Sequence, residues 1–473
     1  MASLKEITPD QQNELDALFA RSRAALKAIA NYDQARVDRI AQCVAWAAGN
    51  AQAFDKLGKM GVEESGVGDW KGRIGKRHKI IGVMRDAMRQ KSVGMINYDA
   101  AKDLAQYAKP VGVIASLIPM TNPELTPIVT SIYAIKARDT VIFSPHPKTR
   151  KTTNEVVNIM RAALKSIGEP EDILLCLPNP NLPQVNKLMS MANLVMATGG
   201  PAMVKAAYSS GTPAFGSGAG NSTMIFDETT NVEEAAANTR MSKTSDFGSG
   251  CSADGNLIIH ESVYDAMVAQ LKKEGGYLIP DDCRDKLAAA MWDEHGARRV
   301  ETVAQPPQKM GQAAGFPVPE DAKFLMVNGT GIGKEHPFSR EKLTTVLALY
   351  KYKGDFENAL QMMEAVYEVG GKGHSCGIYS FNDDHIHQLA MRAPVTRIMV
   401  RQPQSKANAG ALNNGMPMTS SLGCGTWGGN VVSDNISLKY YHNSTWVARP
   451  IAEDKPSEQE LFGEFYDASK NVL

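Results

Sequence analysis

One cysteine lies in a setting that could make its sulfur a nucleophile. Cys251 follows Gly248 and Gly250, and Asp246 and Asp254 flank the stretch. Small neighbours leave room for an electrophile beside a thiolate, and glycine lets backbone N–H groups approach the sulfur. The same pattern is typical of a tight turn around a buried, inert cysteine, so this stretch alone leaves both interpretations open.

The segments around Cys251 predict how the chain presents it. A helix-like segment at 232–241 precedes the cysteine, and an apolar, strand-like run at 257–260 follows it. Between residues 111 and 208, similar apolar runs alternate with helix-like segments, which predicts a parallel, doubly wound sheet. Ligands of such sheets bind beyond the carboxyl ends of the strands. The candidate residues expected at such ends are Asn122, Ser144, Gly199 and Gly200.

Other stretches complete the predicted layout. Helical spacing of apolar residues predicts helices over 10–60 and a basic, amphipathic helical region at 62–92. A glycine-rich bend is expected at 215–221, and a surface connection is expected at 305–320, where Gln, Pro and Gly dominate. The residues from 450 onwards predict a polar helical tail.

Length and composition limit the class of protein. A chain of 473 residues is too long for one ordinary core, so more than one domain is expected. Lys plus Arg and Asp plus Glu both number 51, so no net field favours nucleic acid or an anionic membrane surface. The six cysteines are scattered without a C-x-x-C pair, which argues against a disulfide framework and a thiolate metal site. No signal peptide or bilayer-spanning run is visible, so a reducing cytoplasm is the expected setting.

Eight short motifs run along the chain. They are Pro110-Val-Gly-Val-Ile-Ala, Thr121-Asn-Pro, Ser144-Pro-His-Pro, Ala197-Thr-Gly-Gly-Pro, Gly218-Ala-Gly-Asn, Met241-Ser-Lys-Thr-Ser-Asp with Cys251, Gly370-Gly-Lys-Gly-His and Leu422-Gly-Cys-Gly-Thr-Trp-Gly-Gly-Asn. In this order they resemble the aldehyde dehydrogenase superfamily, and specifically its coenzyme A-acylating branch. The resemblance implies an α/β fold of two doubly wound parallel-sheet domains with a small oligomerisation arm.

The resemblance also implies a division of the chain into domains. Residues 1–92 and 111–222 would form the nucleotide-binding domain, and 223–438 the catalytic domain. Residues 93–110 and 439–473 would form the oligomerisation arm and the C-terminal tail. A homodimer or homotetramer is the expected assembly, with no nucleic acid or membrane partner.

The chemistry implied for Cys251 is covalent. Its thiolate would add to an aldehyde carbonyl, and the Cys251 N–H and the Asn122 side-chain amide would stabilise the oxyanion. Hydride would then pass to a nicotinamide and leave a thioester on Cys251. For Asn122 the alternative is a turn residue before Pro123. His374 would assist attack by a second thiol, or else it only supports its own loop.

The remaining site positions follow from the resemblance. Glu341 would hold the nicotinamide ribose, and a solvated surface glutamate is the alternative. The positions expected to bind NAD, with NADP left open, are Ser144, Pro145, His146, Thr198, Gly199, Gly200, Gly218 and Gly220. The positions expected to line the substrate pocket are Thr121, Gly423 and Gly425.

One absence separates the branches of the superfamily. Hydrolysing members carry a glutamate base just ahead of a Leu-Gly-Gly motif. Residues 216–221 here read Gly-Ser-Gly-Ala-Gly-Asn, without a carboxylate. Coenzyme A is therefore the expected acyl acceptor. A hydrolysing aldehyde dehydrogenase and a non-catalytic binding protein on the same fold are the alternatives.

The residues around the nucleophile differ from the pattern of close acylating relatives. Those relatives commonly read Asp-Asn-Gly before the cysteine, where this chain has Asp246-Phe-Gly. Arg240 on the preceding helix could pair with a sulfonate or carboxylate, although a solvated helix face is the commoner explanation for an arginine. These features favour sulfoacetaldehyde as the substrate, giving sulfoacetyl-CoA, over acetaldehyde and succinate semialdehyde.

Overall fold

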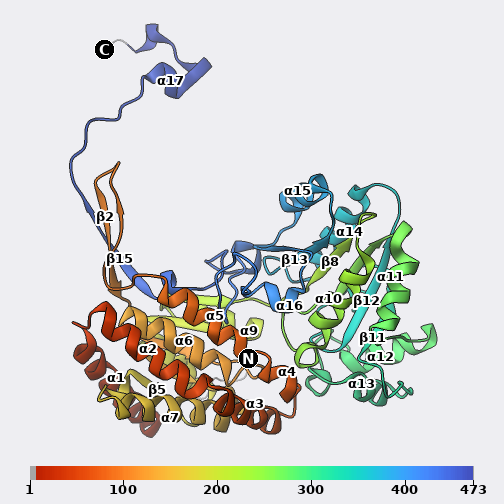
Figure 1. The fold of residues 1–473 in the computed structure, drawn as a ribbon, viewed down its shortest axis with the longest axis horizontal. Coiled ribbons are helices and arrows are strands. Elements are labelled where there is room, and N and C mark those ends of the chain that lie inside the picture. Colours follow the sequence, from red (N-terminus) through yellow and green to blue (C-terminus); the bar gives the residue numbers. More distant parts are fainter. Residues whose placement is uncertain (1–6, 472–473) are drawn as a thin grey trace.

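Two α/β units lie side by side, and a thin strand arm projects from one of them (Figure 1). The structure is a computed structural model, and it describes residues 7–471. Two of its three sheets are parallel, and the third is antiparallel. The predicted α/β fold with two parallel sheets and a small arm is therefore confirmed.

The first unit is a five-stranded parallel sheet with the strand order β5-β4-β3-β6-β7. Its strands are β3 (Val113–Leu117), β4 (Thr140–Ser144), β5 (Leu174–Cys176), β6 (Leu194–Thr198) and β7 (Ala214–Ser217). Its helices are α1 (Pro9–Ile29), α2 (Gln34–Gly49), α3 (Ala51–Ser65), α4 (Trp70–Ile74), α5 (Arg77–Met88), α6 (Leu125–Ala137), α7 (Arg150–Ser166), α8 (Leu182–Met191) and α9 (Pro201–Tyr208).

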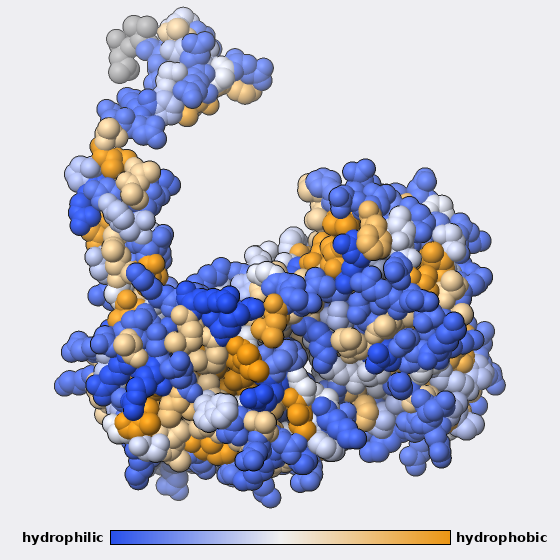
Figure 2. Space-filling model, in the orientation of Figure 1, coloured by the Kyte–Doolittle hydropathy of each residue, from blue (hydrophilic) through white to orange (hydrophobic). Residues whose placement is uncertain are grey.

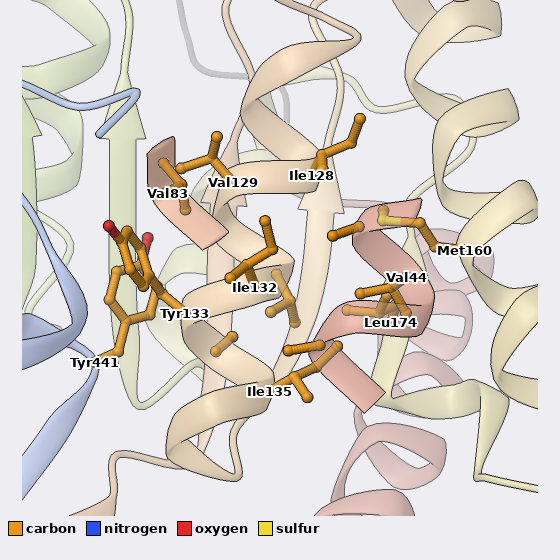
Figure 3. Close-up of a cluster of buried hydrophobic side chains, with 14 of the residues drawn as sticks. Val44, Val83, Ile128, Val129, Ile132, Tyr133, Ile135, Met160, Leu174 and Tyr441 are labelled. Atoms are coloured by element: carbon orange, nitrogen blue, oxygen red, sulfur yellow. The ribbon is translucent and has the colours of Figure 1, made fainter. Parts of the chain in front are cut away.

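Helices cover both faces of this sheet because successive strand residues point to opposite sides. Ile114 and Val141 belong to a core shared with α2, α5, α6 and α7, part of which is drawn in Figure 3. Val113 and Ile142 belong to the opposite core, shared with α1, α8 and α9. Such two-sided burial explains why the strands of this sheet are almost uniformly apolar.

The second unit is a seven-stranded parallel sheet with the order β10-β11-β12-β9-β8-β13-β14. Its strands are β8 (Thr223–Phe226), β9 (Asn256–His260), β10 (Gly276–Leu278), β11 (Phe324–Asn328), β12 (Val346–Tyr352), β13 (Cys376–Tyr379) and β14 (Ile398–Val400). Its helices are α10 (Val232–Thr244), α11 (Glu261–Lys273), α12 (Arg284–Met291), α13 (Pro307–Ala314), α14 (Phe356–Val369), α15 (Asp383–Arg392) and α16 (Gln404–Ala407).

The arm is an antiparallel sheet of β1 (Gly94–Asp99), β2 (Leu104–Pro110) and β15 (His442–Ala448). β15 pairs with β2 along its whole length, from His442 opposite Pro110 to Ala448 opposite Leu104. Beyond it the chain runs away from both units to the short helix α17 (Glu458–Phe462) (Figure 1). The arm and tail expose large hydrophobic side chains, among them those of Trp446, Leu461 and Phe465. Figure 2 shows orange, hydrophobic patches on this part of the molecule.

Two local predictions differ from the structure. The expected surface connection at 305–320 contains α13, which begins with Pro307 and buries Met310 and Ala314. Proline is well suited to a first helical position, so the Pro-rich composition there marked a helix start. The expected bend at 215–221 begins as strand β7, where Gly216 gives room to α9 because a Cβ would lie 2.6 Å from Val204. The sequence reading also missed β10, β11, α15 and β15.

The two parallel sheets meet in sequence between β7 and β8, close to the predicted boundary at residue 222. The assignment of nucleotide binding to one unit and catalysis to the other stays a prediction. Within residues 7–471, no helix has the length and apolar character needed to cross a bilayer.

Candidate active site

A backbone turn of unusual conformation presents Cys251. Between the end of α10 and Cys251, Asp246, Phe247 and Gly248 have φ of 49°, 50° and 67°. Left-handed backbone costs an L-residue about 1–2 kcal/mol, so surrounding contacts must hold Asp246 and Phe247 there. A Cβ at Gly248 would meet the Thr344 carbonyl oxygen at 2.6 Å, whereas one at Gly250 would meet no atom within 4 Å. The turn therefore packs tightly at one glycine and leaves open space beside the cysteine at the other.

The structure brings Cys251 and His374 together. The Cys251 Sγ lies 3.0 Å from the His374 Nε2, although the two residues are 123 positions apart. His374 is fully buried, its Nδ1 lies 2.8 Å from the Ser375 Oγ, and its carbonyl accepts a hydrogen bond from Arg397. This arrangement fits a neutral imidazole that donates from Nδ1 to Ser375 and turns the Nε2 lone pair toward the sulfur.

Burial sets the protonation state of this pair. Burial, with a smaller contribution from the Glu341 carboxyl group, raises the pKa of the Cys251 thiol to about 12. Burial and the nearby Arg397 guanidinium lower the pKa of His374 to about 3. At neutral pH the pair is therefore a thiol beside a neutral imidazole. His374 can accept the proton that Cys251 must lose before its sulfur attacks.

A lysine fixes the orientation of Asn122. The Lys76 ammonium donates to the Asn122 Oδ1 at 2.8 Å and to the Thr121 carbonyl at 3.2 Å. It also donates to the Asp246 carboxylate at 2.7 Å, on the turn that carries Cys251. Because the Asn122 oxygen is occupied by Lys76, the NH₂ end of the amide is left to donate to a ligand. The geometry suits the predicted oxyanion role of Asn122.

Asp246 connects this turn to the first unit. Its carboxylate lies 3.5 Å from Arg73, accepts from the Asp69 N–H at 2.8 Å and accepts from the Ser249 hydroxyl at 2.7 Å. Although burial alone would raise it, Lys76 and Arg73 hold the pKa of Asp246 below its usual value. Arg73 also lies 3.5 Å from the buried Glu124. This charged network holds the left-handed turn against the segment that supplies Asn122.

Glu341 lies beside the nucleophile turn. Its carboxyl group accepts a hydrogen bond from the Gly220 N–H at 3.1 Å, and a Cβ at Gly220 would lie 1.9 Å from the Cys251 carbonyl oxygen. Burial raises the pKa of Glu341 to about 8, against the opposing effects of the Gly220 N–H and Arg298. Gly220 is thus required for the close crossing of two loops, and Glu341 is uncharged for the most part at pH 7. The alternative of a solvated surface glutamate is excluded.

A cavity of about 570 Å³ opens next to these loops. It is lined by α9, by the 218–219 backbone and by the 370–372 and 427–429 loops. A Cβ at Gly200, just before α9, would meet no atom within 4 Å. Glycine backbone at the start of a helix leaves room for a phosphate group, so these residues fit a dinucleotide.

The other predicted positions lie at strand ends or in the glycine loop. Ser144 ends β4, and the His146 ring accepts a hydrogen bond from the Lys148 N–H. Thr198 ends β6, and its hydroxyl lies 3.0 Å from that of Ser421. The Gly423 carbonyl accepts from Arg397, the same side chain that holds the His374 carbonyl. The remaining two positions are Pro145, which is buried after β4, and Gly425, which has a φ of 59°.

Arg240 is not brought into this group. Its Nε donates to the Glu274 carboxylate at 2.5 Å, at the end of α11, so the guanidinium is already paired. The sequence reading missed the roles of Lys76, Lys79 and Lys406. For Lys76 and Lys79 the signal was the basic helical region at 62–92, whose charges need partners wherever the region is buried, whereas nothing in the sequence marked Lys406.

Comparisons with known proteins identify the family of this chain. A model of the aldehyde dehydrogenase family matches residues 2–421. The chain belongs to the aldehyde dehydrogenase family. It is 40% identical to a sulfoacetaldehyde dehydrogenase from Acholeplasma sp, over 94% of this chain and 93% of that protein. It is 37% identical to an acylating sulfoacetaldehyde dehydrogenase from Bilophila wadsworthia, over 94% of this chain and 97% of that protein.

Within the family, the fold is similar to that of an acetylating aldehyde dehydrogenase from Geobacillus thermoglucosidasius. The two structures superpose with a TM-score of 0.91 at 34% identity, covering 96% of this chain and all of the other. The predicted resemblance to the acylating branch is confirmed.

Proposed function

We propose that this protein is a coenzyme A-acylating aldehyde dehydrogenase, which converts an aldehyde, coenzyme A and NAD⁺ into an acyl-CoA and NADH. The observation that carries the proposal is the Cys251 thiol 3.0 Å from a neutral, buried His374 imidazole. The names of the similar proteins support the acylating class.

The first half of the reaction forms a thioester. The Cys251 proton moves to the His374 Nε2 while the sulfur attacks the carbonyl carbon, and the carbonyl oxygen gains negative charge. The Cys251 N–H and the Asn122 amide, which Lys76 orients, donate to that oxygen. A nicotinamide held in the cavity beside Gly218 would supply the hydride acceptor. Loss of hydride from the carbon restores the C=O bond and leaves the acyl group on sulfur.

The second half transfers the acyl group to a thiol. His374, after releasing its first proton to solvent, accepts the coenzyme A proton as that sulfur attacks the thioester carbonyl. The Cys251 thiolate leaves and is reprotonated. Water is a poor rival because residues 216–221, where hydrolysing members carry their glutamate, hold no carboxylate to act as a general base.

Sulfoacetaldehyde is the aldehyde we propose, with sulfoacetyl-CoA as the product. Three similar proteins are named sulfoacetaldehyde dehydrogenases, at 37–40% identity. Acetaldehyde and succinate semialdehyde are the second candidates, because relatives named as aldehyde-alcohol and succinate-semialdehyde dehydrogenases are 36% and 34% identical.

The remaining features of the proposal concern the cofactor and the assembly. NAD would occupy the cavity at α9, with Glu341 facing the nicotinamide end and Gly199 and Gly200 facing the phosphates. The first unit would be the nucleotide-binding domain and the second the catalytic domain. The exposed apolar residues of the arm and tail support a homodimer or homotetramer, and we place the enzyme in the cytoplasm.

The test is NADH formation with and without coenzyme A. We expect multiple turnovers only when the thiol is present, and a single burst of about one NADH per site without it. Full-rate turnover without a thiol would show hydrolysis and overturn the acylating class. Cys251→Ala should abolish both the burst and the turnover, and unchanged NADH formation in this variant would remove the nucleophile role.

A further inference from the structure

Three lysine ammonium groups converge on the turn before Cys251. Lys76 donates to Asp246, and Lys406 on α16 donates to the neighbouring Ser245 hydroxyl at 2.7 Å. Lys79 lies one helical turn after Lys76, and its backbone N–H donates to the Lys76 carbonyl. Residues three apart on a helix lie on the same face, so the Lys79 side chain projects from α5 beside that of Lys76. These side chains, the lysine cluster, come from two separate parts of the chain, α5 with its N-cap and α16.

The three lysines differ in how their charge is compensated. Lys76 is ion-paired with Asp246 at 2.7 Å. Lys406 has only the uncharged Ser245 hydroxyl as a hydrogen-bond acceptor. Among residues 7–471, no carboxylate or other acceptor pairs with the Lys79 ammonium, although the side chain is partly buried. Burial and the other two lysines lower the pKa of Lys79 to about 8, so it remains charged for the most part at pH 7.

The groups that face this cluster leave a positive excess. The carboxyl groups that face the lysine cluster are those of Asp246 and Glu124. Arg73 lies 3.5 Å from both carboxyl groups and already compensates part of their negative charge. His78 is held neutral at pH 7, since burial and the adjacent lysines lower its pKa. Within residues 7–471, neither Lys79 nor Lys406 forms a salt bridge of its own. The carboxylate that acts on the pKa of Lys406 is Asp246, which is already paired with Lys76 and Arg73. An unpaired, partly buried ammonium is unfavourable unless an anion occupies the site during function.

We propose that Lys79 and Lys406 form the anion subsite of the aldehyde pocket and bind the sulfonate group of the substrate. The inference rests on the proposed function and specifies which residues determine substrate choice. In sulfoacetaldehyde the sulfur lies two bonds from the carbonyl carbon, so the cations that bind the sulfonate must lie near the Cys251 sulfur. Lys406 donates to Ser245 on the turn that presents Cys251, and Lys79 lies one helical turn from Lys76, which contacts Asn122 and Asp246. Arg240, by contrast, is paired with Glu274. A sulfonate stays charged at every physiological pH and offers three acceptor oxygens to the two ammonium groups.

The first test compares a charged and an uncharged aldehyde of similar size. Lys79→Met and Lys406→Met should each lower kcat/KM for sulfoacetaldehyde by about 10- to 100-fold and leave propionaldehyde within about 3-fold. Lys79→Arg should retain most of the preference because the charge is kept. Arg240→Leu is the matched control, and its preference should equal that of the wild type. Equal losses with both aldehydes, or a lost preference in Arg240→Leu alone, would overturn the subsite.

The second test does not use turnover. Iodoacetate and iodoacetamide alkylate Cys251 through the same reaction, but only iodoacetate is an anion. Lys79→Met should lower the ratio of their rates by about 5-fold, because one favourable charge interaction is lost. An unchanged ratio would contradict the subsite even if the variant loses activity.

The two proposals fail in different ways. Wild-type enzyme that acylates propionaldehyde but not sulfoacetaldehyde would refute the proposed substrate. The ratio of the iodoacetate and iodoacetamide rates then tests the anion subsite independently. A lower ratio in Lys79→Met would support a subsite that binds another anionic aldehyde. Succinate semialdehyde, whose carboxylate carbon lies three bonds from the carbonyl, is the aldehyde to assay in that case.

Discussion

Lys76→Met should separate the chemistry of the site from the stability of the fold. The Lys76 side chain is 12% exposed and that of Asp246 is 1% exposed, with 2.7 Å between the paired atoms. Removing one partner of a buried pair costs about 3–5 kcal/mol when the other charge is left alone. Asp246 keeps Arg73, Ser249 and the Asp69 N–H, so we expect the free energy of unfolding to fall by about 2–3 kcal/mol.

The same substitution should also slow the reaction through Asn122. Without Lys76, the Asn122 Oδ1 loses its donor and the amide is free to turn away from the developing oxyanion. Removing an oxyanion donor outright costs about 10²–10³ in kcat, so a misaligned donor should cost about 10- to 100-fold with little change in KM. The assay is NADH formation at saturating coenzyme A, together with denaturant unfolding of each variant.

A double-mutant cycle tests whether Lys76 acts through Asn122. In the Asn122→Ala background, Lys76→Met should lower kcat by less than about 3-fold, because the group that it orients is already gone. Fully additive losses would refute this reasoning. Lys56→Met is the control, since Lys56 forms an exposed pair with Glu155 at 3.0 Å. It should leave kcat unchanged and alter the free energy of unfolding by less than about 0.5 kcal/mol.

Further predictions concern the thiol, the loop crossing and the arm. Because the pKa of Cys251 is raised, its alkylation by iodoacetamide should speed up about tenfold per pH unit from pH 8 to 10, and a plateau near pH 7 would show that the thiolate is already formed. Gly220→Ala places a Cβ 1.9 Å from the Cys251 carbonyl oxygen, so we expect kcat to fall more than about 10-fold. A Cβ at Gly415 would meet no atom within 4 Å, so Gly415→Ala should match the wild type. Equal kcat values for Gly220→Ala and Gly415→Ala would contradict the steric argument. Truncation after β15, removing residues 449–473, should reduce the assembly size measured by sedimentation velocity, and an unchanged size would show that the tail is not an assembly contact.

The sequence alone predicted the fold class, the strands and helices of the first sheet, and Cys251 as the candidate nucleophile. Strands buried on both faces must be apolar throughout, so β3, β4 and β6 were visible as apolar runs between helix-like segments. Among the helix-like segments predicted between residues 111 and 208, one is α8. The Cys251 turn could be recognised from local composition, because its glycine and small residues are required by the steric contacts of the turn itself. Short elements such as β10, with three residues, carry too little periodicity to be recognised.

Only the tertiary structure decided which side chains meet at that turn. His374 reaches Cys251 from 123 residues away, and Lys76 reaches Asp246 from 170 residues away. It also decided that Arg240 is paired while Lys79 is not. A lysine or arginine looks alike in sequence whether it is solvated, ion-paired or free to bind an anion. The difference depends on which distant elements pack around it, because packing alone sets its neighbours and its access to water.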